Sequence, residues 1–154
     1  MRKKESLNTY EAVKEKALRL LEFRSHSEHE LKMKLRRAGA DEDNIEAALA
    51  FCREYGFVND ADFAARKAAD LFRLKKYGRR RIENELRELG IPEEYIITDG
   101  LDADEERENL RALAEKKLGG DHSKKSKDKC IRFLIYRGYD YYDIMDVMEE
   151  FYDV

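Results

Sequence analysis

The sequence predicts an all-α protein made of three tandem repeats, each with three short helices of helix-turn-helix type, arranged as an elongated array. Three glycines, Gly39, Gly90 and Gly138, can be aligned so that a leucine precedes each by four residues and an isoleucine follows each by six. Their spacings of 51 and 48 residues leave room for three short helices, and self-similarity at such a period is typical of stacked helical units. Charged residues make up 42% of the chain and hydrophobic residues another 42%, with one proline and no tryptophan, which favours exposed helices over buried parallel strands. The aligned leucines are Leu35, Leu86 and Leu134, and the aligned isoleucines are Ile45, Ile96 and Ile144.

The first repeat is expected over residues 8–59 and begins with an amphipathic segment from Ala12 to Phe23. Ser27 and Glu30 then form the pattern of a capping box, because the serine oxygen can accept a free backbone N–H while the glutamate reaches back to the serine N–H. The second helix is predicted to end at Gly39, where a left-handed C-cap needs no side chain. The predicted inward residues are Leu31, Leu35 and Ala38 before this glycine and Ile45, Ala48 and Leu49 after it, in a helix that Asp41 can cap.

The second repeat is expected over residues 60–104, with its first helix over Asp62–Leu74. Its second helix ends at Gly90, after which Ile91 can cover the helix end and Pro92 suits the first turn of a third helix. That third helix is predicted to carry Tyr95 and Ile96, and the second to bury Ile82, Leu86 and Leu89.

The third repeat is expected over residues 105–154, with its first helix from Glu105 to Leu118. A long polar connection over residues 119–127 is expected before a second helix that ends at Gly138. The three repeats together predict nine helices in three groups of three. The predicted inward residues of the third repeat are Ile131, Leu134, Ile135, Ile144, Val147 and Met148.

No catalytic or cofactor site can be recognised in the sequence. It contains no glycine-rich phosphate-binding loop, and no Cys/His group has zinc spacing. His26 and His29 lie at a predicted helix start and are expected to be solvated, while Cys52 and Cys130 fall inside predicted helices as small buried hydrophobic residues. We therefore expect a protein that is not an enzyme and needs neither cofactor nor metal.

The sequence carries no signal for membrane insertion or export. No apolar run approaches the roughly 18 residues that a membrane span needs. The charged N-terminal residues Met1–Glu5 are not followed by a hydrophobic stretch. These features predict a cytoplasmic protein.

Charge is strongly patterned although the net charge is only -3. Residues 64–90 contain nine Lys or Arg and four acids, whereas residues 92–106 contain seven acids and no base. Basic residues thus gather on the second helix of a repeat and acids on the third, so that stacking could create one positive and one negative stripe. For any single charge, an ordinary solvated helix surface is the simpler interpretation.

A cluster of cations at the junction between the first two helices of the middle repeat is the candidate binding surface. Cations this close together repel one another unless an anionic partner offsets them, and the turn at Gly78 is expected to hold them outward. The candidate residues are Lys75, Lys76, Arg79, Arg80 and Arg81, with Arg36, Arg37 and Lys32 on the equivalent helix of the first repeat.

Several motifs, taken together and in order, resemble the RecX family of recombinase regulators. In the first repeat they are Leu20, Arg24, Ser25, Ser27, Glu28, Glu30, Leu31 and Leu35, then Tyr55-Gly56-Phe57-Val58-Asn59-Asp60 and Phe63-Ala64. In the later repeats they are Tyr77-Gly78-Arg79-Arg80-Arg81-Ile82, Leu86, Gly90-Ile91, Phe133-Leu134 and Arg137-Gly138-Tyr139. The resemblance covers about residues 12–150, nearly the whole chain.

The resemblance implies a modulator of RecA, the strand-exchange ATPase that forms filaments on DNA. Family members are helical proteins of three repeats that bind in the groove of the RecA–DNA filament, and they usually restrain its extension, strand exchange and co-protease activity. They are not themselves enzymes. For this chain we expect a monomer that binds the RecA filament through the cations named above, with single-stranded DNA inside the filament as a further possible contact.

A second interpretation is a DNA-binding protein of the helix-turn-helix type that acts without RecA. Helices starting near Arg79 or Lys127 would then lie in a groove of the DNA. The arginines of the middle repeat offer phosphate contacts, but Asn84 is the single amide side chain nearby that could read bases. A preference for the RecA–DNA filament over single-stranded DNA alone would separate the two interpretations.

Overall fold

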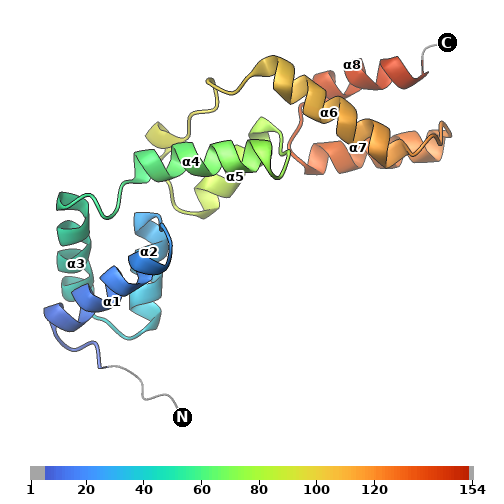
Figure 1. Ribbon diagram of the computed structural model, residues 1–154. Helices are drawn as coiled ribbons and strands as arrows, with labels where there is room; N and C mark the ends of the chain where they lie inside the picture. Colours follow the sequence, from blue (N-terminus) through green and yellow to red (C-terminus); the bar gives the residue numbers. More distant parts are fainter. Residues whose placement is uncertain (1–5, 153–154) are drawn as a thin grey trace. The chain divides into compact units, whose positions relative to one another are not determined.

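The computed structural model describes residues 6–152, and these form eight α-helices and one 3-10 helix without a strand (Figure 1). The predicted all-α fold is confirmed. No helix in this part of the chain is both long enough and apolar enough to span a membrane. The α-helices are α1 (Tyr10–Phe23), α2 (Glu28–Arg37), α3 (Glu42–Glu54), α4 (Asp60–Arg73), α5 (Arg79–Glu88), α6 (Ala103–Leu118), α7 (Lys124–Tyr136) and α8 (Tyr141–Tyr152), and the 3-10 helix is η1 (Glu93–Tyr95).

The chain forms two compact units. The first contains the described residues up to Ala65 together with Arg87–Ile96. The second contains Arg66–Leu86 and the described residues from Ile97 onward. The middle repeat therefore contributes residues to both units.

In the first unit, α1, α2 and α3 pack against one another around a hydrophobic core (Figure 1). The prediction that Ala38 faces inward is wrong, because Ala38 is the exposed C-cap of α2. The chain reverses at Gly39, and Ala40 enters the core instead. The core residues are Leu7, Val13, Ala17, Leu31, Leu35, Ala40, Ile45, Ala48, Leu49, Cys52 and Val58.

Local hydrogen bonds explain where the helices of the first unit begin and end. The predicted capping box of α2 is confirmed, with Glu30 N donating to Ser27 Oγ at 3.1 Å and Ser27 N donating to Glu30 Oε1 at 3.1 Å. Gly39 follows α2 with φ of 98°, a conformation that glycine adopts without steric cost. Asp41 then caps α3 by accepting the N–H of Asn44 at 2.8 Å. The second helix therefore starts and stops where the sequence predicts.

In the second unit, α6, α7 and α8 pack together around a separate core (Figure 1). The prediction that Ile135 faces inward is wrong, since 47% of its surface is exposed. Its neighbour Leu134 occupies the inward position and is fully buried. The core residues are Leu110, Ala114, Leu118, Cys130, Leu134, Tyr139, Ile144, Val147 and Met148.

The third helix of the middle repeat is reduced to the single 3-10 turn of η1. Pro92 precedes this turn, and Ile96 ends it as a half-buried C-cap, unlike the fully buried Ile45 and Ile144. The residues that follow are β-branched or turn-forming, Ile96-Ile97-Thr98-Asp99-Gly100, and they propagate a helix poorly. The middle repeat thus matches the other two repeats as far as its aligned glycine, Gly90, and differs from them in the helix that follows.

The connection between α6 and α7 is shorter than the sequence suggests. Helix α6 ends at Leu118, Gly119 takes a left-handed φ of 56°, and α7 begins at Lys124. Ser123 caps α7 by accepting the N–H of Ser126 at 3.2 Å, so the lysine-rich residues 124–127 are helical. The polar connection covers residues 119–123 and not 119–127.

The core register can be tested at two neighbouring positions. Leu134→Ala should lower the free energy of unfolding by about 2–5 kcal/mol, because it removes a fully buried side chain and leaves a cavity. Ile135→Ala, at the half-exposed position beside it, should cost no more than about 1 kcal/mol. Urea unfolding followed by circular dichroism measures both. Equal losses would mean that the register of α7 is misassigned.

Candidate functional site

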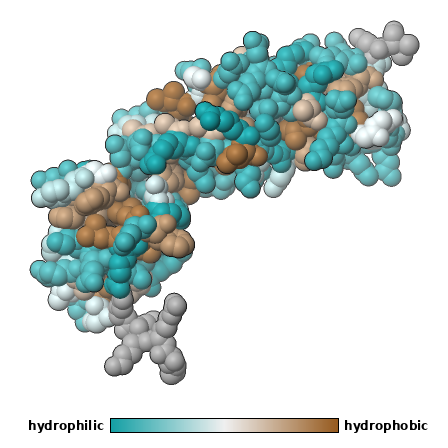
Figure 2. Space-filling view, in the orientation of Figure 1, coloured by the Kyte–Doolittle hydropathy of each residue, from teal (hydrophilic) through white to brown (hydrophobic). Residues whose placement is uncertain are grey.

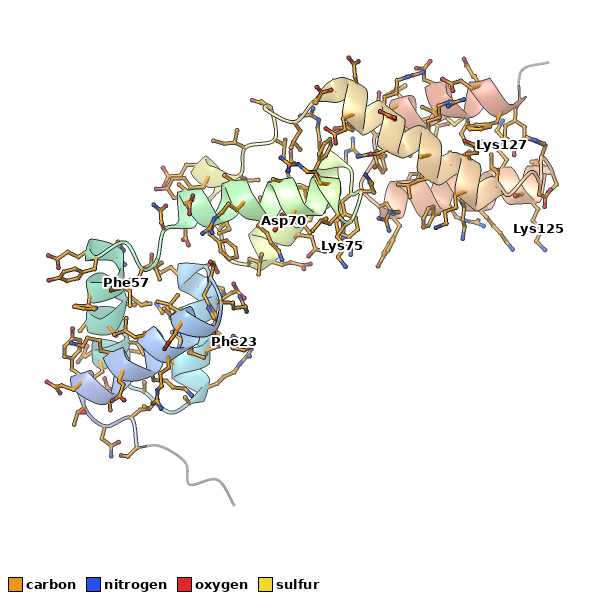
Figure 3. The ribbon with its side chains drawn as sticks, in the orientation of Figure 1. Phe23, Phe57, Asp70, Lys75, Lys125 and Lys127 are labelled. Carbon is orange, nitrogen blue, oxygen red and sulfur yellow. The ribbon has the colours of Figure 1, made fainter. Side chains whose placement is uncertain are left out.

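The predicted cation cluster lies where α4 leads into α5, inside the second unit. Lys75 and Lys76 occupy the turn between the helices, and Figure 3 shows Lys75 where α4 ends. Lys76 has a φ of 58°, a left-handed conformation that is uncommon for a residue with a side chain. Arg79, Arg80 and Arg81 form the first turn of α5. The turn and the helix start therefore place all five predicted cations on one short segment.

Main-chain hydrogen bonds hold this segment against the turn between α7 and α8. Gly78 N donates to the Arg137 carbonyl at 2.9 Å, and Arg80 N donates to the Gly138 carbonyl at 3.2 Å. A helix start leaves its first N–H groups without partners inside the helix, and here carbonyl groups of the third repeat accept two such donors. We call this contact between the start of a second helix and the turn after the next second helix a repeat joint.

Two side chains of the α7–α8 turn complete this repeat joint. The Tyr139 hydroxyl donates to the Lys76 carbonyl at 2.6 Å, and the Arg137 guanidinium donates to the Lys75 carbonyl. Tyr139 is 2% exposed, and burial raises the pKa of its phenol above the ordinary range, so the hydroxyl keeps its proton at physiological pH. The left-handed turn at Lys76 is thus fixed from the third repeat.

The backbones at this joint approach so closely that both glycines are required. A Cβ added at Gly78 would overlap the backbone of Gly138, and one added at Gly138 would overlap the backbone of Arg81. Gly138 also has a φ of 98°, which disfavours any side chain. The glycine of the Arg137-Gly138-Tyr139 motif is therefore explained by both conformation and contact.

The first unit contains a second repeat joint of the same kind. The start of α2 packs on the turn at Gly90, where an added Cβ would overlap the His29 side chain. The Ser27 hydroxyl donates to the Leu89 carbonyl at 2.6 Å across this joint. Gly39, the equivalent glycine of the first repeat, has nothing within 4 Å of its added Cβ and takes part in no such joint among the described residues.

Arg79 is directed into the second unit and not outward as the sequence predicts. Its Nε donates to Glu106 Oε2 at 2.6 Å, and its two terminal nitrogens donate to the carbonyls of Leu101, at 2.9 Å, and Thr98. The side chains of Arg79 and Glu106 are 31% and 15% exposed. Arg79 therefore ties the irregular segment after η1 to the start of α5.

Arg81 is likewise engaged within the second unit. Its guanidinium lies between the rings of Tyr77 and Tyr136, 4.7 and 4.8 Å from their centroids, and its Nε donates to Glu85 at 2.9 Å. The interaction with the Tyr136 side chain and then the hydrogen bond to Glu85 raise the pKa of Arg81 above its ordinary value. The Arg81 charge thus helps to hold α5 on α7.

Three cations of the cluster remain on the surface. Lys75 and Lys76 are exposed, and the Arg80 side chain is 70% exposed while pairing with Asp140 at 3.0 Å. An exposed ion pair of this kind contributes little to stability, so Arg80 can exchange its partner at low cost. The exposed part of the predicted cluster is therefore Lys75, Lys76 and Arg80, which we call the joint cations.

The predicted cations of the first repeat lie on α2, in the first unit. Arg36 pairs with Glu42 at 2.6 Å and Lys32 pairs with Glu46 at 2.8 Å. The hydrogen bond to Glu42 raises the pKa of Arg36. Arg37 is exposed at the end of the helix. The pairs join basic α2 to acidic α3, so part of the positive charge is offset inside the unit.

Both cysteines and one of the three histidines are buried. Cys52 and Cys130 are free thiols inside the two cores, as predicted, and burial raises the pKa of each. The prediction that His26 is solvated is wrong, because His26 is 2% exposed. Burial lowers its pKa, and its ring nitrogens lie 2.9 Å from the Arg24 carbonyl and 2.8 Å from Lys34 Nζ. Within residues 6–152 no group of His, Cys, Asp or Glu side chains is placed to hold a metal ion.

Sequence reasoning did not assign site roles to the aromatic residues of the joint or to Arg137. The Arg137 guanidinium lies 4.9 Å from the Tyr77 ring centroid and 5.7 Å from that of Phe133. With Arg81 and Tyr136, these residues form a ladder in which cations and rings alternate. The motifs at Tyr77–Ile82, Phe133-Leu134 and Arg137-Gly138-Tyr139 contain all of its members except Tyr136. The sequence thus shows these residues, but it does not show which cation lies against which ring.

Tandem three-helix repeats connected through glycine joints define the class of this protein. Sequence models of the first, second and third three-helix domains of RecX match residues 14–52, 59–97 and 104–148. The chain therefore belongs to the RecX family.

Named relatives and solved structures agree with this assignment. The "Regulatory protein RecX" of Cronobacter sakazakii is 34% identical over 157 residues, covering 94% of each chain. That of Vibrio campbellii is 38% identical over 133 residues, covering 83% of this chain and 84% of the relative. The crystal structure of RecX from Lactobacillus salivarius superimposes with a TM-score of 0.79 at 22% identity, covering 92% of this chain and 95% of that one, which shows a shared fold.

Two substitutions distinguish the energetic cost of crowding at the joint from the cost of a strained backbone conformation. Gly39 and Gly138 share a φ of 98°, so an alanine at either position pays a similar conformational cost. Gly138→Ala should lower the free energy of unfolding by at least about 1 kcal/mol more than Gly39→Ala, because only its Cβ meets neighbouring backbone. Thermal or urea unfolding measures the difference. Equal costs would show that the joint is looser than described.

Unfolding measurements also distinguish arginines of α5 that stabilise the fold from those that lie on the surface. Arg79→Met should lower the free energy of unfolding by about 1–3 kcal/mol, because it leaves Glu106 and two carbonyls without their donor. Arg80→Met should change it by no more than about 0.5 kcal/mol, since its ion pair is exposed. If Arg80→Met were the more destabilising variant, the assignment of structural and surface roles would be reversed.

Proposed function

We propose that this chain regulates RecA by binding the RecA–DNA filament, and that the joint cations form part of the contact surface. Membership of the RecX family over nearly the whole chain supports the partner. The choice of surface rests on one observation: the cations at the joint differ in how exposed they are. Arg79 and Arg81 are partly buried and paired within the second unit, while Lys75, Lys76 and Arg80 remain exposed beside them.

The chemistry of the joint cations suits such a partner. A protein filament on DNA presents both carboxylates and phosphates, and the Arg80 guanidinium can bind either with two parallel hydrogen bonds. Lys75 and Lys76 add positive charge with little demand on geometry. Because the turn that carries them is fixed by Arg137 and Tyr139, less conformational entropy is lost when the partner binds. On α2, Arg37 is exposed, and Lys32 and Arg36 could join the surface by exchanging their pairs with glutamates.

The proposed effect is inhibition of RecA ATPase, strand exchange and co-protease activity by occupation of the filament groove. The chain acts in the cytoplasm as a monomer, uses no cofactor or metal, and has no turnover of its own. Its resident cysteines and His26 are buried in the folded units and are not positioned as nucleophile and base on a surface.

The alternative of a helix-turn-helix DNA-binding protein acting without RecA is less well supported. A recognition helix needs side chains at its start that are free to enter a groove. In α5 the first-turn residues Arg79 and Arg81 are engaged with Glu106 and with Glu85 and two tyrosine rings. These arginines would have to break their contacts within the second unit before α5 could read bases.

The contact surface can be tested by neutralising two joint cations that the fold does not need. Lys75→Gln combined with Arg80→Gln should weaken binding to preformed RecA–ssDNA filaments by about five- to thirtyfold, as expected for two exposed charges lost from a contact. Its remaining affinity should depend less steeply on salt. Co-sedimentation at two salt concentrations measures both effects.

A matched control removes the same charge elsewhere. Lys124→Gln combined with Lys125→Gln neutralises two exposed lysines at the start of α7 (Figure 3 labels Lys125) and should leave filament binding nearly unchanged. Unaltered binding by the Lys75 and Arg80 variant at both salt concentrations would exclude the joint cations from the contact. Binding to ssDNA alone as tight as to the filament would favour the DNA-binding alternative.

A further inference from the structure

A pocket of about 450 Å³ lies against α6 in the second unit. Six of its lining residues come from α6 and follow one face of this helix, since they are spaced by one, three or four positions between Glu105 and Lys116. The remaining lining residue is Lys76, from the left-handed turn before α5. Its volume is within the range of about 300–1,000 Å³ that is usual for ligand sites.

Asn109 is the most informative residue of this pocket. Its side chain is 6% exposed, and its amide nitrogen Nδ2 is buried without a hydrogen-bond partner. Nearly all buried polar groups in folded proteins are paired, because an unpaired buried donor forfeits its bonds to water. Because Asn109 lines the pocket, a rotation of its side chain would bring this amide to an acceptor that enters from outside. The structure thus keeps an unfavourable group beside a position where a ligand can pair with it after that rotation.

Two lysines add positive charge to the same pocket. Lys76 and Lys116 are both exposed, and neither forms an ion pair with another residue of the described part of the chain. Lys76 reaches this position from a backbone conformation that costs free energy and that Tyr139 stabilises through the Lys76 carbonyl. The lining of this pocket therefore includes both a residue with an unusual backbone conformation, Lys76, and one with an unpaired amide, Asn109.

The remaining lining residues indicate which kind of ligand fits. Ala112 and Leu113 provide an apolar wall, which suits a side chain or a stretch of main chain. Glu105 and Glu108 lie on the same face and would repel a polyphosphate such as a nucleic acid strand. A peptide segment with one carboxylate meets less repulsion than a polyphosphate does, because its single charge can lie by Lys76 and Lys116 and away from the glutamates.

We propose that this pocket binds a short acidic segment of a partner protein. A main-chain carbonyl of the segment accepts the Asn109 amide, its carboxylate pairs with Lys76 and Lys116, and an apolar atom group contacts Ala112 and Leu113. The proposal rests on the proposed function and deepens it, because it assigns the contact at this pocket to the protein component of the filament and not to its DNA.

Replacing the unpaired amide separates a binding role from a structural one. Asn109→Leu keeps a side chain of similar length and removes the unsatisfied donor, so it should raise the melting temperature by about 2–4 °C. If the amide binds the partner, the same variant should bind RecA–ssDNA filaments about tenfold more weakly. A gain in stability with a loss of binding is not expected of a residue whose role is structural.

A second variant tests the pocket without changing a buried residue. Ala112→Tyr places a large ring at the exposed wall of the pocket and should weaken filament binding by a similar factor. Ala50→Tyr makes the same change at an exposed alanine in α3 and should have little effect. If Asn109→Leu fails to fold, this pair alone decides the matter.

The outcomes distinguish the pocket from the broader function. If the wild-type chain binds the filament, and Asn109→Leu and Ala112→Tyr bind equally well, the pocket proposal is overturned and the proposed function stands. If both variants weaken binding to ssDNA alone as much as to the filament, the occupant is nucleic acid and the assignment to an acidic protein segment is wrong. If the wild-type chain does not bind the filament, both proposals fail.

Discussion

The start of α5 is held by carbonyl groups that belong to another repeat, and much of the second unit depends on this contact. Gly78 N and Arg80 N donate to the carbonyls of Arg137 and Gly138. A helix usually offsets its first N–H groups with a capping side chain and acidic residues. Helix α5 has no acidic residue in its first turn and begins with three arginines. The neighbouring turn supplies negative carbonyl dipoles instead, which allows a basic helix start.

This contact also explains why the cluster of cations has two roles. The close approach of backbones at Gly138 brings the side chains of α5 against α6, α7 and the segment after η1, where Arg79 pairs with Glu106 of α6 and Arg81 lies near two tyrosine rings. Side chains that point away from the contact remain exposed, as Lys75 and Arg80 do. One arginine-rich segment can therefore both join two repeats and present charge at the surface.

A residue of the same turn, Lys76, also lines the pocket on α6, which we propose as a second contact site. Tyr139 holds the Lys76 carbonyl, and Lys76 in turn lines the pocket that contains the unpaired Asn109 amide. On the face that Figure 2 shows, the surface is mostly hydrophilic, with small apolar areas between hydrophilic ones. Such a surface suits a partner that combines carboxylates, main chain and phosphates, and it suits reversible binding better than a large apolar interface does.

The sequence by itself determined the helices, their caps and the repeat register, because these depend on residues a few positions apart: the capping box at Ser27, the left-handed glycine at Gly39 and the buried Leu134 were all predictable. The family could be recognised for the same reason. Only the tertiary structure decided which cations of α5 are engaged inside the second unit and which remain exposed, and it alone revealed the orphaned amide of Asn109. The partners of these cations can lie far along the chain, as Glu106 does for Arg79 and Asp140 for Arg80. Local periodicity places a side chain on a face of a helix, but it does not say which neighbour that face will meet.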